Sequence, residues 1–588
     1  MKKKANRHPK ASPVRNPAAP RGPSFEPQGL RGAGKNQSPG HPGLRGLAVW
    51  LAPVLVLGIW HLGDVGRGIK ETGHTWQTGV YLALAAAVLA VLALMWRMLL
   101  GCGNRRLEQV YPAAGLLLGL LYLFVLPPLS APDEISHYVS AYQLSSTFTG
   151  QPSNDRYGRV LLRPQDAWVE DLAGTFVYEA DPDGHLQVTR ESLEGAEKFC
   201  RVLDESVYRL LWELRGGKQY HPQKTEELKG ALVSSTYPPV QTTPLAYVPQ
   251  ALAMAGARLL GMNTIALMYL GRMANLVFFV VMTWLALRRL PFGKEVLMGV
   301  ALLPMTLHLS ASFSYDVMIM GCMFLLTAVC LDLAYKKEQV EPGDVVLLMV
   351  LMAVCGPCKM IYAVMMGLCL LVPVRKFGGW GRWALCAAAV GGAWAMAMYA
   401  VNSQVVASYV AETESYVQWA GEPGYSILLL VHRPVRLVRM FYQTLLDQME
   451  VWHLGIIGAH LSGLDKVLNV PYGAVVLFTL GLLALAFLKP GESVLICGPR
   501  RVWILAVCGL CMAAAMFSML IAWTPLSSWV INGVQGRYFL PFLPVLLMAC
   551  KNRLVVLTRN IDRPVLCLMC CLNGYVLLRL FSIVCTRL

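Results

Sequence analysis

Charged residues are scarce in this sequence of 588 residues, because only 15% are Asp, Glu, Lys or Arg whereas 55% are hydrophobic. A soluble domain normally carries charge at about a quarter of its positions, so this composition excludes an ordinary soluble protein. Apolar runs long enough to cross roughly 30 Å of hydrocarbon recur along most of the chain. The sequence therefore predicts an all-α integral membrane protein.

The sixteen cysteines provide neither a disulfide framework nor a metal site. Nearly all lie in apolar runs, where cysteine packs as a small apolar side chain. The long polar segment that follows residue 130 contains only Cys200. Cys355 and Cys358 form one CxxC pair, but a zinc site would need a second pair or a nearby histidine cluster, and the sequence has neither. We expect no metal and no cofactor.

The N-terminal tail, residues 1–46, holds ten Lys or Arg and one acid, Glu26, and so supplies +9 of the net charge of +16. It is rich in Pro, Gly, Asn and Ser and lacks apolar periodicity, which predicts disorder. Because it adjoins an apolar run, we interpret it as a cytoplasmic anchor beside anionic lipids and expect no nucleic-acid partner. It is too long for a signal peptide, and no small-residue cleavage site follows Leu47–Leu62.

Apolar runs predict 11–13 transmembrane helices. The runs at 345–356 and 361–374 are short for a full crossing, so we expect them to form one broken hairpin buried against other helices. The remaining candidate spans are 47–63, 78–96, 111–129, 265–287, 296–312, 316–334, 382–402, 472–489, 502–523, 538–550 and 564–582.

One alternating path through these spans places the basic loop residues on the cytoplasmic side, together with the N-terminus. It leaves two long segments outside, 130–264 and 403–471. The part of the first segment from 130 to 240 has 17 acids against 11 bases, as the rule expects for an outer loop. The inner basic residues are Arg97, Arg105, Arg106, Arg288, Arg289, Lys294, Lys336, Lys337, Arg375, Lys376, Arg382, Lys489, Arg500, Arg501, Lys551 and Arg553.

The first outer loop is predicted to be a small α-rich unit. It combines a turn at Asp181–Gly184 with helical patterning around Glu191–Leu214. Residues 244–260 are apolar, but a span there would place the arginines after 287 outside. We therefore expect a helix that lies at the outer interface, with Tyr247 and Arg258 as its anchors.

Ionisable residues follow the third span directly. Pro127 and Pro128 end the helix at the membrane surface, and Asp133, Glu134 and His137 come next. Charged groups at that depth are costly and tend to be functional. Neighbouring side chains on an extended chain point to opposite sides, so we expect Asp133 to face a cavity and Glu134 to support it. The alternative is a helix N-cap, with Asp133 capping and His137 solvated.

Further polar residues are predicted to reach the same outer face. Lys359 lies at the tip of the broken hairpin, where the orientation rule disfavours a lysine. Arg537 follows a glycine that permits close backbone approach, and its planar fork suits a phosphate. Together with the carboxylates, these cations indicate a site for a lipid-linked phosphate substrate. The other candidate binding residues are Tyr237, Asp316, Gln535 and Tyr538.

At these positions the chain resembles a family of bacterial multi-pass membrane proteins known as domain of unknown function 2142. The resemblance covers about residues 111–582 and leaves the tail and an extra transmembrane pair, 47–110, in front. The strings that carry it are Pro132-Asp133-Glu134-Ile135-Ser136-His137, Tyr142-Gln143, Pro249-Gln250, Gly271-Arg272-Met273-Ala274-Asn275, Leu303-Pro304-Met305, Ser312-Phe313-Ser314-Tyr315-Asp316 and Gly533-Val534-Gln535-Gly536-Arg537-Tyr538-Phe539-Leu540-Pro541.

That family is in turn similar to the GT-C glycosyltransferases, which have an acidic motif at the start of the first outer loop and use a polyprenyl-linked sugar donor. The resemblance implies that Asp133 or Glu134 is the base and that Lys359 and Arg537 meet the donor phosphate. A Trp-Trp-Asp-type acceptor signature and a soluble C-terminal domain are missing, so a glycan or lipid-linked acceptor fits better than a protein.

The resulting hypothesis is an inverting glycosyltransferase on the outer face of a bacterial cytoplasmic membrane. It would move a sugar from a polyprenyl-phosphate donor to a cell-envelope polysaccharide or its lipid-linked precursor. Two alternatives stay open. A flippase or transporter of lipid-linked oligosaccharide predicts polar groups at the bilayer midplane and internal repeats. A non-catalytic scaffold of an envelope-assembly complex would not need the Asp-Glu pair.

Overall fold

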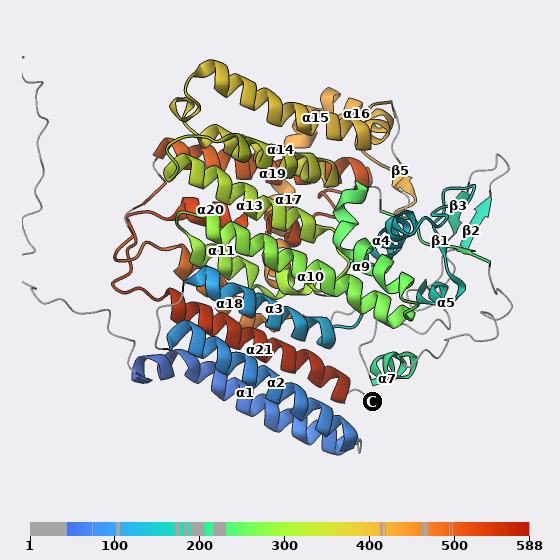
Figure 1. Ribbon diagram of the computed structural model, residues 1–588, viewed down its shortest axis with the longest axis vertical. Helices are drawn as coiled ribbons and strands as arrows, with labels where there is room; N and C mark the ends of the chain where they lie inside the picture. The colour runs from blue at the N-terminus through green and yellow to red at the C-terminus, as the bar shows by residue number, and fades with distance from the viewer. Residues whose placement is uncertain are drawn as a thin grey trace, which may run out of the picture.

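The computed structural model describes residues 44–72, 75–101, 106–170, 177–180, 186–189, 205–215, 231–240, 242–411, 416–417, 419–459, 461, 469–492, 494–496 and 498–586. The predicted disordered tail therefore lies outside the described residues, apart from its last three positions. The long helices run roughly parallel to one another (Figure 1).

Seven helices of the described ranges are long and apolar enough to cross a membrane. Three shorter apolar helices accompany them, α14 (Pro342–Cys358), η2 (Met360–Leu371) and α18 (Tyr472–Ala486). The expected all-α integral membrane protein is thereby confirmed. The seven helices are α2 (Thr75–Leu100), α3 (Leu107–Val125), α10 (Thr264–Arg289), α13 (Asp316–Tyr335), α15 (Trp380–Ala411), α19 (Gly498–Trp523) and α21 (Asp562–Thr586).

Two of the predicted spans are broken in the structure. The run at 296–312 forms α11 (Lys294–Ala301) and α12 (Pro304–Ser310), because Pro304 lacks the N–H that a continuous helix needs. The run at 538–550 forms the 3₁₀ turn η4 (Gly536–Phe539) and α20 (Leu543–Cys550). The number of 11–13 crossings stays a prediction, because it counts such broken segments as spans.

The broken hairpin is confirmed. Helix α14 packs against η2, which also contacts α13 and α19, and Lys359 joins the two arms with an extended backbone. The second arm is a 3₁₀ helix of 12 residues, although 3₁₀ runs are usually no longer than three or four.

Basic residues from several loops meet at one end of the helices. Lys551 Nζ donates to Glu492 at 2.7 Å and also binds Glu295, while Lys489 pairs with Asp562. These ion pairs join the ends of α11, α18, α20 and α21. A second set at the ends of α10, α13 and α14 consists of Arg289, Lys337, Asp332 and Asp344. The expected gathering of these loops is confirmed, and the membrane side that they face stays a prediction.

The first outer loop lies beyond the opposite end of the bundle (Figure 1). Its described helices include α4 (Glu134–Phe148), α5 (Pro164–Ala167) and α7 (Glu205–Leu214). Two small antiparallel sheets were not predicted: β1 (Leu161–Leu162) pairs with β4 (Val233–Ser234), and β2 (Val177–Ala180) with β3 (Leu186–Thr189). The predicted turn at Asp181–Gly184 and the first part of the expected helix at Glu191–Leu214 lie outside the described residues.

The apolar stretch 244–260 is helical, as expected, and forms η1 (Pro244–Tyr247) and α9 (Val248–Leu259). One of its predicted anchors, Tyr247, is wrong, and the other, Arg258, stays a prediction. Tyr247 is 2% exposed and bonds to His137, and Arg258 Nη1 donates to the Ser145 hydroxyl at 2.7 Å. Both side chains therefore bind α4, where Tyr247 is enclosed and Arg258 is half-buried.

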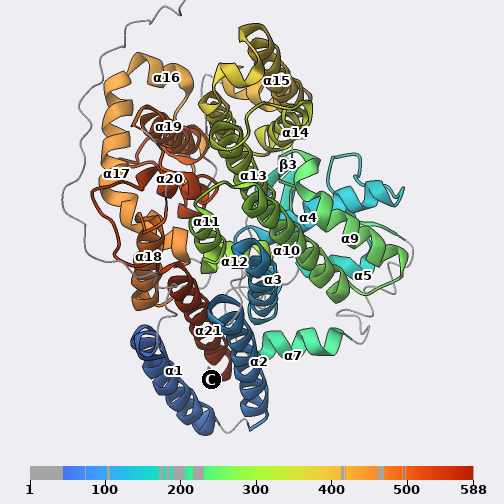
Figure 2. The ribbon, with the colours of Figure 1, turned by 60° about the vertical axis from the view of Figure 1, so that its left-hand side comes forward.

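The second outer segment contains a long helix that the sequence analysis missed. After α16 (Ile427–His432), the helix α17 (Pro434–Ile457) runs along one side of the molecule between α16 and α18 (Figure 2). Its outward stripe is apolar and includes Val435, Val438 and Tyr442. The interspersed arginines at 433, 436 and 439 hid this helix from a search for apolar runs.

The extra N-terminal pair packs on the end of the chain. Helices α1 (Leu44–Thr72) and α2 both contact α21, and the three lie together at the edge of the bundle (Figures 1 and 2).

The orientation of the bundle can be tested by cysteine labelling. Tyr157→Cys lies in the first outer loop and Leu554→Cys at the ion-paired end, where the parent side chains are 53% and 93% exposed. An impermeant thiol reagent applied to intact cells is expected to label position 157 and not position 554 above the parent background. After permeabilisation both positions should react. The reverse pattern in intact cells would overturn the orientation.

Candidate functional site

The backbone between α3 and α4 is strained. Within the described part of the chain, Leu129 (φ 69°) and Asp133 (φ 57°) are the only residues other than glycine in the left-handed region. Such strain persists only where the surroundings enforce it, and it concentrates at functional sites. Both strained positions lie within five residues of each other, at the start of the first outer loop.

Asp133 occupies the N-cap position of α4, but its side chain makes no capping hydrogen bond. The side chain is 69% exposed, and its Oδ2 accepts from Arg537 Nη2 at 3.4 Å. The predicted extended backbone at Asp133 is wrong, because the residue adopts a left-handed conformation. Asp133 and Glu134 nevertheless point to different surroundings, one exposed and one buried.

Glu134 is fully buried and binds backbone. Its Oε2 accepts from Ala131 N at 3.1 Å and its Oε1 from Phe313 N at 3.0 Å. Arg272 Nε lies 3.3 Å from the same Oε1. Burial raises the pKa of this carboxyl, and the Arg272 charge acts in the opposite direction. Glu134 thus joins the start of α4 to the loop that leads into α13.

Arg272 is a site residue to which the sequence analysis gave no role. It is fully buried on α10, and its guanidinium donates to the carbonyls of Leu123 at 3.3 Å and Leu126 at 3.0 Å, at the end of α3. An arginine in the middle of an apolar run was the available signal, because ionisable residues inside a membrane are rarely without a role. Its partner 138 residues away could not be identified from the sequence.

The loop between α12 and α13 is held by amide side chains. Asn275 Nδ2 donates to the carbonyls of Ser312 at 2.7 Å and Ser314 at 3.1 Å, and Gln250 Nε2 donates to that of Phe313 at 3.4 Å. These bonds fix the backbone directly before Asp316, whose carboxylate is buried at the start of α13.

Arg537 lies between the two aspartates. Its Nε is 3.4 Å from Asp316 Oδ2, and its Nη2 is 3.4 Å from Asp133 Oδ2. The residue is only 7% exposed, yet Nη1 makes no hydrogen bond with any described residue. Burial works to lower the pKa of this guanidinium, but the charge of Asp316 and other neighbours raises it overall. Arg537 is therefore permanently charged, and its Nη1 group remains able to donate a hydrogen bond to a ligand.

Helix α17 positions Arg537. A Cβ atom at Gly536 would lie 2.1 Å from the Trp452 carbonyl oxygen, so only glycine fits where η4 crosses α17. Trp452 Nε1 donates to Val534 O at 3.0 Å, and Ile531 N donates to Thr444 Oγ1 at 2.8 Å. The close backbone approach predicted at this glycine is thereby confirmed, and its partner is a helix of the same chain.

Lys359 reaches the same place from the tip of the hairpin. Its Nζ lies 3.3 Å from the centroid of the Tyr538 ring and 5.9 Å from that of Tyr315. Burial acts to lower its pKa, but Tyr315, Tyr538 and Asp316 raise it overall. Tyr362 Oη donates to the Tyr538 carbonyl at 2.8 Å and fixes that ring's backbone. No ion pair joins Lys359 to a carboxylate among the residues that the structure describes.

His137 is buried beside these groups. Its Nδ1 shares a hydrogen bond of 2.7 Å with Tyr247 Oη, and its ring lies 5.1 Å from the Tyr315 ring. Burial lowers its pKa to about 4 although Asp316 and Asp133 act to raise it, so it is neutral at pH 7. The alternative with a solvated His137 and a capping Asp133 is therefore wrong.

The structure brings together six of the nine predicted site residues around Arg537, namely Asp133, His137, Asp316, Lys359, Arg537 and Tyr538. Glu134 lies behind them, where it supports the backbone. Gln535 is exposed at the N-cap of η4. Tyr237 is buried in its own loop, where the Ser235 hydroxyl binds both its N–H and its carbonyl.

A bundle of apolar helices with a charged site at one end defines a multi-pass membrane protein. Residues 116–546 match the family described as predicted membrane protein (DUF2142), and the chain belongs to that family. The expected resemblance is confirmed, over a somewhat shorter range than 111–582. The match omits α1, α2 and α21, the three helices that pack together at the edge. No curated protein and no solved structure matches the chain.

Proposed function

We propose that the protein is an inverting glycosyltransferase that uses a polyprenyl-phosphate sugar on the outer face of a bacterial cytoplasmic membrane. The acceptor is a cell-envelope glycan or its lipid-linked precursor. The observation that carries the proposal is the pairing of an exposed carboxylate, Asp133, with a buried arginine that retains an unused donor.

The cations suit the donor phosphate. Arg537 Nη1 is a buried donor that no described residue accepts from, a costly state that a phosphate oxygen would relieve. Lys359 lies against the same Tyr538 ring and adds a second positive charge. Charge builds up on the phosphate as the sugar leaves it, and fixed cations in a water-poor site stabilise that charge most.

The carboxylate suits the acceptor. Asp133 is the exposed acid of the cluster, so a hydroxyl can reach it, and it can take the proton as the hydroxyl attacks the sugar carbon. The sugar would then lie between Asp133 and the phosphate-binding cations. Attack from the side opposite the phosphate inverts the configuration at that carbon. Asp316 neutralises Arg537 from the buried side and keeps its fork in place.

Arg537→Ala is expected to weaken binding of a polyprenyl phosphate, the leaving group of the proposed reaction, by at least tenfold. Arg537→Lys should restore only part of the affinity, because an ammonium cannot make the forked contact. Lys359→Ala should weaken binding to a smaller extent, since it removes one of two charges. Binding is measured on purified protein by native mass spectrometry, with thermal stability recorded for each variant.

Arg156→Ala is the matched control, because this arginine is exposed in the same outer loop region and stacks on Tyr157 away from the cluster. It should bind polyprenyl phosphate as the parent does. Unchanged binding by stable Arg537→Ala and Lys359→Ala proteins would remove the phosphate role and favour the scaffold. If either variant still binds polyprenyl phosphate and its cells make normal glycan, the substituted residue is not a catalytic group.

A further inference from the structure

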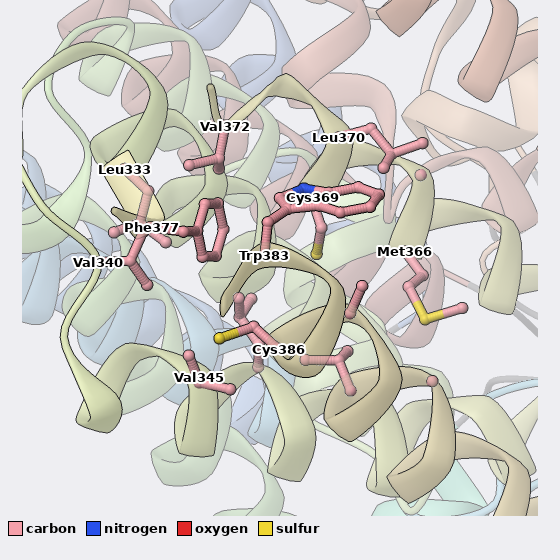
Figure 3. Close-up of a pocket in the computed structure, with 15 residues that line it drawn as sticks. Leu333, Val340, Val345, Met366, Cys369, Leu370, Val372, Phe377, Trp383 and Cys386 are labelled. Atoms are coloured by element: carbon pink, nitrogen blue, oxygen red, sulfur yellow. The ribbon is translucent and has the colours of Figure 1, made fainter. Parts of the chain in front are cut away.

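A second site lies at the opposite end of the hairpin. The cavity of about 230 Å³ is lined by residues of α14, η2, η3 (Val374–Phe377) and the start of α15, together with Leu333 of α13 (Figure 3). Trp383 and Phe377 extend into it from two elements, and Cys386, Met366 and Val345 close its sides (Figure 3). The lining residues carry no charge, so the cavity is suited to hydrocarbon.

The size of the cavity argues for an occupant. Apolar cavities of about 150 Å³ stay free of water and take up small apolar molecules. This one is larger, and its wall loses van der Waals contacts on every side that remains unfilled. Leu370, which is 54% exposed, and the exposed Ala387 line its edge, so the cavity is open to the outside of the bundle. In a membrane protein that outside is lipid.

Basic residues adjoin the cavity lining in the sequence, on the loop side. Arg375 precedes the lining residue Phe377, and Arg382 precedes Trp383, with its Nη1 3.4 Å from a Cβ built on Gly378. Both arginines are exposed, and neither forms an ion pair within the described ranges. Lys376 between them is already bound to three carbonyls, those of Leu333, Ala334 and Lys337.

We propose that this cavity binds one acyl chain of an anionic phospholipid from the cytoplasmic leaflet, whose phosphate lies between Arg375 and Arg382. Moving a chain from lipid into an apolar cavity changes its surroundings little, so tight packing and the headgroup supply the selectivity. Two exposed arginines that form no ion pair with a described residue, and that adjoin the uncharged lining in sequence, match a ligand with one negative group and one hydrocarbon tail.

Filling the cavity provides the first test. A side chain at Gly391 would enter open space and the residue lines the cavity, whereas the adjacent Gly392 is exposed and does not line it. Delipidated protein is titrated with phosphatidylglycerol and followed by native mass spectrometry. Gly391→Phe is expected to lower the fraction carrying one tightly held lipid at least fivefold. Gly392→Phe, the matched control, should retain it.

Charge removal provides the second test. Arg375→Gln with Arg382→Gln should lower binding of phosphatidylglycerol at least fivefold, while Arg553→Gln with Arg559→Gln, two exposed arginines of another loop, should not. Phosphatidylcholine with the same acyl chains should bind the parent weakly. Equal binding of both lipids, or retention by Gly391→Phe, would overturn the proposal. So would displacement of phosphatidylglycerol by an equal amount of polyprenyl phosphate. These results do not depend on sugar transfer, because the cavity and the charged site lie at opposite ends of the hairpin.

Discussion

Asp133→Asn is expected to abolish sugar transfer without lowering the amount of folded protein. Removing a positioned general base typically costs on the order of 10²–10⁴-fold in rate. The folded amount should hold because the side chain is 69% exposed and makes no capping hydrogen bond to α4. Asparagine also tolerates the left-handed backbone at this position. The readout is the envelope-glycan composition of cells whose only copy is the variant, with the membrane level of the protein measured alongside.

Asp447→Asn is the matched control, because Asp447 is exposed on α17 and bonds only to Gln443 among the described contacts. Cells with this variant should make the parental glycan. His137→Ala should reduce transfer less than Asp133→Asn, because the neutral imidazole contacts Tyr247 and Tyr315 and lies behind the exposed carboxylate. Parental glycan in cells with Asp133→Asn would leave the flippase or the scaffold as the better hypothesis.

Glu134→Gln is expected to destabilise the protein strongly, by about 3–5 kcal/mol, because it leaves the buried Arg272 charge without its counterion. From the sequence, Glu134 was expected to support Asp133, although it was kept among the catalytic candidates because the resemblance allows either residue to be the base. Its geometry favours the positioning role, since its oxygens bind two backbone N–H groups and Arg272. The measurements are the thermal unfolding of purified protein in detergent and the fraction that elutes as a single folded species.

The double variant Glu134→Gln with Arg272→Met should recover part of this stability, because it removes both buried charges. Glu341→Gln is the control, since Glu341 is 70% exposed and its pair with Lys337 contributes at most about 1 kcal/mol. A stable Glu134→Gln protein that has lost sugar transfer would contradict the positioning role and return Glu134 to the catalytic group.

Much of the site could be anticipated, but its partners could not. Asp133, Asp316, Lys359 and Arg537 all follow or precede apolar runs, so counting spans places them at one end of the bundle. The contacts among these residues, in contrast, could not be predicted from the sequence. The hydrogen bond between Arg537 and Asp133 joins residues 404 positions apart, and no local pattern encodes a contact at that separation. Arg272 had a local signal, an arginine inside an apolar run, but its partner Glu134 lies 138 positions away.

The sequence by itself determined that the chain enters a membrane, where most helices begin and end, and which loops share an end. Those properties depend on local apolarity, on prolines and on the placement of basic residues. Each of these signals affects only the residues close to it in the sequence. Only the tertiary structure decided that Glu134 is buried and Asp133 exposed, and that α17 presses on Gly536. It also decided that the second arm of the hairpin winds as a 3₁₀ helix beside an apolar cavity. Packing among distant helices sets these features, because a buried ion pair or a close backbone crossing exists only where two segments meet.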